Sequence, residues 1–135
     1  MSRVTLLLSK DPVHQRGGDV AMTRLLVELA ADAFTLDAIC LSTHTSDRPL
    51  CVGAHRIPVT RVPKPAVAPA ALARRSLRHR RSLVHVRFDT RALRAAVERH
   101  ETGKFLAEHS YMAESLLHSA STVPLVVNTH VSEAD

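Results

Sequence analysis

The sequence predicts an α/β fold with an open, doubly wound, mainly parallel sheet of about five strands and flanking helices. Short apolar runs that fit buried strands alternate along the chain with stretches of helical periodicity. The first forty residues read as strand, helix and strand, and a crossover between parallel strands is nearly always right-handed. We therefore interpret residues 1–135 as a single domain.

The first expected strand and the loop after it suggest a ligand site. Val4, Leu6, Leu7 and Leu8 fit a strand buried on both faces, and a polar loop then closes on Gly17 and Gly18. Asp19 is expected to cap the helix that follows. In that helix, apolar residues recur at helical spacing: Met22, Leu25, Leu26, Leu29, Ala30 and Ala33. The glycines thus reach a helix N-terminus, which favours an anion, and they permit close approach of a phosphate or a sugar.

The next segments read as a strand, a loop, an edge strand and a connector. Residues 34–41 alternate apolar side chains as a second strand does, and residues 42–53 are expected to form a loop. Residues 55–59 fit an edge strand, because Pro58 cannot donate a hydrogen bond to a neighbour. Residues 60–69 contain three prolines and predict an extended connector.

The second half of the chain predicts two basic helices, then a strand, a helix and a last strand. Residues 70–83 fit an arginine-rich surface helix. Asp89 or Thr90 is expected to cap a second helix, which Gly103 ends. The buried residues of that helix are expected to be Ala92, Leu93, Ala96 and Val97. Residues 104–108 and 123–129 fit strands, and Met112, Ala113, Leu116 and Leu117 mark the helix between them.

Two histidines follow predicted strands. His109 comes after the strand at 104–108, and His130 ends the strand at 123–129. The carboxyl ends of parallel strands are where ligands gather in open α/β sheets, and the glycine loop belongs to the same edge. Neutral imidazole can donate from one ring nitrogen and accept at the other, so both residues suit hydrogen bonding or proton transfer. The alternative is that they merely finish their strands.

The positive charge is concentrated in one segment. The formal net charge of the chain is +5. Residues 61–99 alone contain eleven Lys or Arg and only two acids. The basic helical segment, about residues 66–100, can attract nucleic acid, anionic lipid or a phosphorylated substrate, or it can be a solvated surface. The sequence shows neither a signal peptide nor a membrane-spanning run, so we expect a cytoplasmic protein with reduced Cys40 and Cys51.

Several familiar sites are missing from the sequence. The Gly17-Gly18 loop lacks the Lys-Ser or Lys-Thr of a phosphate-binding Walker loop and the spaced glycines of a dinucleotide fingerprint. No GxSxG elbow supports hydrolase chemistry. The histidines and cysteines lack the short spacings of metal ligands, so no metal is expected.

The motifs together resemble a known family. The segment VTLLLSKDPVHQRGGDVAMTRLLVELA, the histidine in FLAEHSYMA and the histidine in VVNTHVS look like those of the N-terminal Rossmann-like domain of a retaining, group 1 glycosyltransferase of the GT-B type. The resemblance covers nearly the whole chain. It implies transfer of a sugar, as in a hexosyltransferase, from a nucleotide-sugar donor to an acceptor, without a metal or other cofactor.

The resemblance also implies roles for individual residues. Gly17 and Gly18 would approach the donor phosphate or sugar, and His109 would be the catalytic residue near the transferred sugar. Thr129 and His130 would line the same cleft, with Tyr111, His14 and Arg16 as acceptor contacts. In lipid-glycosylating members, basic helices rest on anionic membrane, a role expected here of Arg74, Arg75, Arg78 and Arg81.

The donor-binding second domain of that family has no counterpart in these residues. We therefore expect a truncated N-terminal domain that is inactive alone, because the second domain supplies the groups that stabilise the departing nucleotide diphosphate. An unpaired sheet edge in such a fragment would favour a homodimer. The alternative function is a non-catalytic α/β module that binds anionic lipid or nucleic acid through its arginine-rich helix. A receiver-like domain is disfavoured, because no acidic pocket follows the first strand beyond Asp11.

Overall fold

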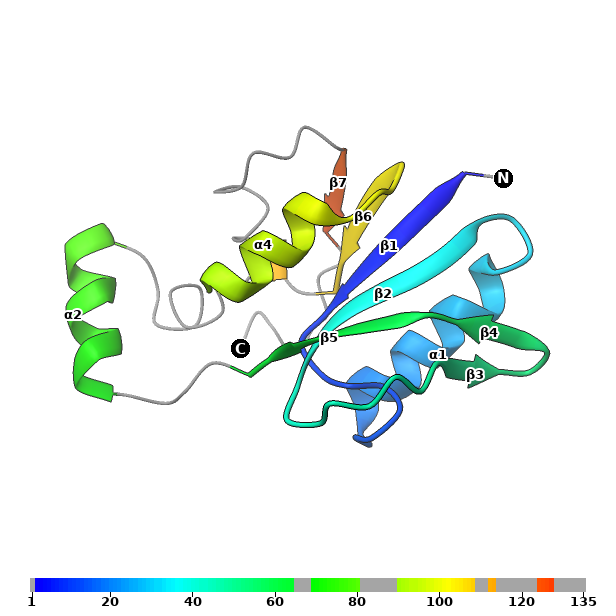
Figure 1. Ribbon diagram of the computed structural model, residues 1–135, viewed down its shortest axis with the longest axis horizontal. Coiled ribbons are helices and arrows are strands. Elements are labelled where there is room, and N and C mark those ends of the chain that lie inside the picture. The colour runs from blue at the N-terminus through cyan, green and yellow to red at the C-terminus, as the bar shows by residue number, and fades with distance from the viewer. Residues whose placement is uncertain (1, 65–68, 81–89, 109–111, 114–123, 128–135) are drawn as a thin grey trace.

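The computed structural model describes residues 2–64, 69–80, 90–108, 112–113 and 124–127, without the side chains of residues 19, 69, 79 and 125. Five strands form one sheet in which every neighbouring pair is parallel (Figure 1). The predicted fold class is confirmed. The strands, in sheet order, are β5 (Val59–Pro63), β2 (Thr35–Ser42), β1 (Arg3–Leu8), β6 (Lys104–Ala107) and β7 (Leu125–Val127).

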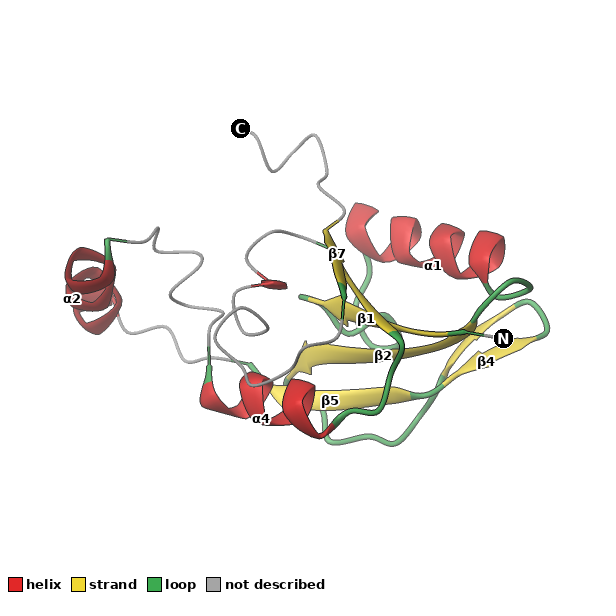
Figure 2. Ribbon diagram, turned by 90° about the horizontal axis from the view of Figure 1, so that it is seen from above, coloured by secondary structure: helices red, strands yellow, loops and turns green. Residues whose placement is uncertain are grey.

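Helices cover both faces of the sheet. Helix α1 (Gly18–Ala30) lies on one face, and α4 (Arg91–Arg99) lies on the other (Figure 2). Alternate side chains of β1 and β2 therefore enter two different cores. Leu7 and Ile39 pack with Leu93 of α4, whereas Leu6 and Ala38 pack with Val27 of α1. Both faces of the central strands are buried, as the continuous apolar runs predict.

A small hairpin replaces part of the expected loop. Strand β3 (Leu50–Val52) pairs antiparallel with β4 (His55–Ile57), and Leu50 and Ile57 join the core on the α1 side. Three predictions are wrong here: residues 42–53 are not all loop, residues 55–59 are not one strand, and residues 60–63 belong to β5 and not to a connector. Pro58 separates β4 from β5, and Pro63 is tolerated because β5 is an edge strand of the described sheet.

Helix α1 begins earlier and faces differently than the sequence suggests. Gly17, not Asp19, is the cap residue, and no side chain caps the helix. The buried face carries Val20, Thr23 and Val27, while Leu29 is 73% exposed. Met22 and Leu25 are also exposed, so the apolar spacing locates the helix but does not tell which of two adjacent stripes packs on the sheet.

Helix α4 agrees closely with its prediction. The hydroxyl oxygen of Thr90 accepts a hydrogen bond from the Leu93 N–H at 3.1 Å, and Leu93, Ala96 and Val97 are buried. Ala92 is exposed, contrary to expectation. Gly103 does not end the helix, because His100 is its C-terminal cap. A side chain at Gly103 would meet the Arg3 carbonyl oxygen at 3.0 Å, so the glycine allows close packing on β1.

Helix α2 (Pro69–His79) stands away from the sheet in both views (Figures 1 and 2). It shows the predicted surface character, since Arg74, Arg75 and Arg78 are exposed. Leu77 is 82% exposed between them. No helix in the described part of the chain is long and apolar enough to cross a membrane.

Candidate functional site

The carboxyl edge of the parallel sheet gathers the polar loops. Residues 9–17 follow β1, residues 43–49 follow β2, and Lys64 follows β5. Strand β6 ends at the same edge, because Ala107 pairs in register with Leu7 near the end of β1. The loops from separate strands thus meet at one edge, as expected for an open α/β sheet.

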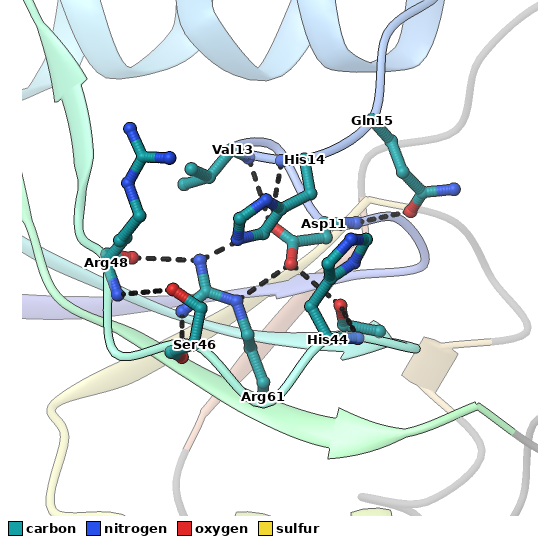
Figure 3. A network of polar contacts seen from close by, with 9 residues as sticks. Asp11, Val13, His14, Gln15, His44, Ser46, Arg48 and Arg61 are labelled. Atoms are coloured by element: carbon teal, nitrogen blue, oxygen red, sulfur yellow. Dashed lines mark hydrogen bonds and ion pairs between the residues drawn. The ribbon is translucent and has the colours of Figure 1, made fainter.

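A buried ion pair lies at the centre of this edge (Figure 3). The Arg61 Nε–H donates to Asp11 Oδ2 at 2.8 Å, and the two side chains are 4% and 0% exposed. The Ser42 hydroxyl donates to the same oxygen at 2.7 Å. The backbone N–H groups of Val13 and His14 donate to Oδ1 at 3.0 and 3.4 Å, as in an Asx turn. Asp11 therefore joins the loop after β1 to the end of β2 and to β5.

Arg61 also holds the loop after β2. Its Nη1 donates to the Ser46 carbonyl at 2.6 Å, and its Nη2 donates to the Arg48 carbonyl at 2.8 Å. A guanidinium presents its donors in a rigid planar fork, so one buried arginine fixes the path of several backbone carbonyls. In the sequence Arg61 stands out only as part of the basic segment, since its partners lie 13 to 50 residues away along the chain.

The ion pair changes the acidity of two groups. Burial alone would raise the pKa of Asp11, but hydrogen bonds from Arg61, Ser42 and Val13 and the positive charge of Arg61 outweigh it and lower the pKa from 3.8 to about 2. Burial, with a contribution from the Asp11 charge, raises the pKa of Cys40 to about 12. Asp11 is thus held as a carboxylate and Cys40 as an unreactive thiol.

The glycine turn leads into helix α1 through an unusual backbone conformation. Gly17 has φ 133° and ψ −179°, a conformation essentially restricted to glycine. A Cβ at Gly17 would lie 3.8 Å from the Lys10 Nζ, and a Cβ at Gly18 would enter open space. The turn therefore combines accessible backbone at the start of α1 with a nearby ammonium group.

Two histidines stack beside this turn. The rings of His14 and His44 are 4.2 Å apart between centroids, and their planes differ by 11°. His14 Nε2 is buried and has no hydrogen-bond partner among the described residues. Arg16, the other acceptor contact expected in this loop, is exposed. Nothing in the sequence singled out His44, whose position depends on a contact 30 residues away from it in the chain.

A polar groove of about 710 Å³ opens next to His44, between the loop after β2 and strand β5. Its volume lies within the range of small-molecule sites. The lining is Ser42, Thr43, His44, Thr45, Ser46, Asp47, Val59, Thr60, Arg61, Pro63 and Lys64.

Several predicted site residues fall outside the part of the chain that the structure describes. His109, Tyr111, Thr129 and His130 lie outside the described residues, as does Arg81 of the basic segment. Leu116 and Leu117 of the expected helix, and the ends of the strand predicted at 123–129, lie there as well. Residues 2–64, 69–80, 90–108, 112–113 and 124–127 contain no group of three or more His, Cys, Asp or Glu side chains that would hold a metal ion.

Comparison with known proteins adds no identification. No protein-family model matches the chain, and neither do any of the curated proteins or solved structures with which it was compared.

The lowered pKa of Asp11 makes part of the stability pH-dependent. Because the folded-state pKa lies below the unfolded value of 3.8, this contribution is present above pH 3.8 and is lost as the pH falls toward 2. We expect the difference in free energy of unfolding between wild type and Asp11→Asn to shrink by about 2 kcal/mol between roughly pH 5 and 2. Urea denaturation at each pH measures it. The exposed Asp32→Asn substitution is the control, and a constant difference for Asp11→Asn would contradict the prediction.

Proposed function

We propose that this chain is the acceptor-side, N-terminal domain of a retaining glycosyltransferase of the GT-B type, which uses a nucleotide sugar. The observation that carries the proposal is the Gly17 turn at the start of α1, on the carboxyl edge of a parallel sheet, in a loop that contacts the polar groove through the stack of His14 on His44. The proposal includes a cytoplasmic location, because the donor substrate is a nucleotide sugar and such donors are made in the cytoplasm.

The turn supports donor binding through simple electrostatics. The first helical hydrogen bond runs from the Ala21 N–H to the Gly17 carbonyl, so the N–H groups before Ala21 have no intrahelical acceptor. Such groups, with the helix dipole, favour the negative charge of a phosphate. Lys10 adds a positive charge close to Gly17.

Transfer needs a second, donor-binding domain opposite this edge. That domain would hold the nucleotide and stabilise the departing diphosphate, while His109 would hydrogen-bond the transferred sugar. Thr129, His130 and Tyr111 would complete the cleft from this side. The chain alone is therefore expected to bind nucleotide sugars weakly and to transfer nothing.

The glycines provide a direct test with matched controls. Gly18→Ala should leave stability unchanged or slightly higher, because its methyl group enters open space, yet it should lower kcat/KM at least tenfold by occupying the place of the donor phosphate. Gly17→Ala should also cost about 1–3 kcal/mol of folding free energy through backbone strain. Gly53→Ala, at φ 59° in the distant β3–β4 hairpin, should cost stability but leave transfer unchanged.

The assay uses the chain joined to a donor-binding domain and a panel of common nucleotide sugars. Loss of transfer in Gly18→Ala and in His109→Ala, with activity retained in Gly53→Ala, is the expected pattern. Absence of transfer from every donor, or full activity in His109→Ala, would remove the glycosyltransferase assignment.

The second candidate is a non-catalytic module that binds an anionic lipid surface through α2. The specific observation is that α2 stands clear of the sheet (Figure 2). Leu77 of this helix is 82% exposed, and Arg74 and Arg78, which flank it in the sequence, are exposed as well. An apolar side chain among guanidinium groups suits a lipid headgroup layer, where the arginines meet phosphates and the leucine enters the acyl boundary. A nucleic acid would use the arginines but not Leu77.

Vesicle sedimentation tests whether α2 binds an anionic lipid surface, and parallel binding to oligonucleotides tests nucleic acid. Arg78→Gln should weaken binding to phosphatidylglycerol vesicles about fivefold, since each basic residue near an anionic surface contributes about 1 kcal/mol. Leu77→Gln should weaken it as well, whereas Arg56→Gln on β4 should not. Equal binding of all variants would exclude a role for α2, and binding to oligonucleotides that is unaffected by Leu77→Gln would favour nucleic acid.

A further inference from the structure

The polar groove beside β5 has a pre-organised wall. Residues 43–49 carry no helix or strand, but Arg61 fixes this segment by donating hydrogen bonds to the carbonyl groups of Ser46 and Arg48. The Ser42 hydroxyl accepts from the His44 N–H at 3.0 Å while donating to Asp11, which anchors the start of the segment. A ligand in the groove would therefore not have to order the backbone of this wall on binding.

The polar side chains of the groove are available to a ligand. Among the residues that the structure describes, no hydrogen bond or ion pair engages the side chains of Thr43, Thr45, Asp47, Thr60 or Lys64. Three hydroxyls, a carboxylate and an ammonium together offer both donors and acceptors. Arg61 is not available in the same way, because its guanidinium is already bonded to Asp11, Ser46 and Arg48.

This lining fits hydroxyl groups better than a phosphate. A phosphate dianion would meet Lys64 but also the negative charge of Asp47, and Arg61 is neutralised by Asp11. Each hydroxyl of a sugar, in contrast, both donates and accepts, so Asp47 can accept from one hydroxyl while Lys64 donates to another. Val59 and Pro63 add apolar surface for the C–H face of a ring.

His44 gives the groove a flat, oriented ring. Its imidazole stacks on His14, which fixes the orientation of the ring plane, and His44 itself is exposed. His44 is the aromatic residue among those that line the groove, and it stands between Thr43 and Thr45 in the chain.

We propose that the groove formed by residues 42–47 and β5 binds a neutral sugar or cyclic polyol, with Asp47, Thr60 and Lys64 as its hydrogen-bonding contacts. We identify this ligand with the acceptor of the transfer reaction, and that identification rests on the proposed transferase function. Binding itself needs neither donor nor second domain, so its measurement can fail or succeed independently of transfer.

The test is an NMR titration of the full 135-residue chain with glucose, mannose, N-acetylglucosamine and myo-inositol. At least one of these should shift amide signals in residues 43–47 and 60–64. Asp47→Asn should weaken that binding about tenfold or more, because a hydrogen bond to a charged carboxylate is stronger than one to a neutral amide. Thr60→Val should weaken it less, and the matched carboxylate substitution Asp32→Asn should leave it unchanged.

Four results would overturn the proposal. They are no shift with any of the four compounds, shifts confined to the Gly17 turn, unchanged affinity in Asp47→Asn, and tighter binding of inorganic phosphate than of the sugars in the same groove. If the chain binds a sugar in the groove but the two-domain protein transfers none, the groove proposal is supported and the transferase function is contradicted.

Discussion

The buried ion pair between Asp11 and Arg61 is the interaction on which the carboxyl edge depends. A carboxylate and a guanidinium are costly to remove from water, and they are tolerated only when nearly all of their hydrogen-bonding capacity is used. Here Asp11 accepts from Arg61, Ser42 and two backbone N–H groups, and Arg61 also donates to two carbonyls. The pair thus joins three segments that the sheet alone would leave as separate loops.

Both candidate binding features are built on this pair. On one side, Asp11 shapes the turn that leads through His14 to Gly17 and the start of α1. On the other side, Arg61 fixes residues 46 and 48 and so forms the wall of the polar groove. The His14–His44 stack links the two loops at the surface. A donor site and an acceptor site that share one rigid support would keep a constant geometry relative to each other, which transfer between two substrates requires.

Local sequence patterns predicted β1, β2, β6 and β7 of the described sheet, but not its edge strand β5. The runs at Val4–Leu8 and at residues 34–41 are apolar on both faces, so β1 and β2 were identified from their composition. Thr90 and the spacing of Leu93, Ala96 and Val97 likewise predicted α4. Strand β5 was missed because prolines dominate its surroundings, and β3 was missed because a three-residue strand carries too little periodicity. Strand β4 lies within the strand predicted at 55–59, but its pairing in a hairpin was not predicted.

The site was predicted only where the backbone itself is unusual. The glycine pair indicated a turn at a helix start, which the positive φ of Gly17 bears out, whereas Arg61 and His44 act through partners distant in sequence. Neither residue has a local signal, because charge counts and spacing cannot show that Arg61 points into the protein rather than into solvent. The placement of His109 and His130 stays a prediction.

A double-mutant cycle between Asp11 and Arg61 tests the central role of the ion pair most directly. Asp11→Ala and Arg61→Ala should each lower the free energy of unfolding by about 3–5 kcal/mol, because each leaves the other charge buried without its partner. The double variant should cost little more than either single one, while the surface pair of exposed Asp32 and partly buried His55 should show almost no coupling. Additive costs for Asp11 and Arg61 would contradict this account.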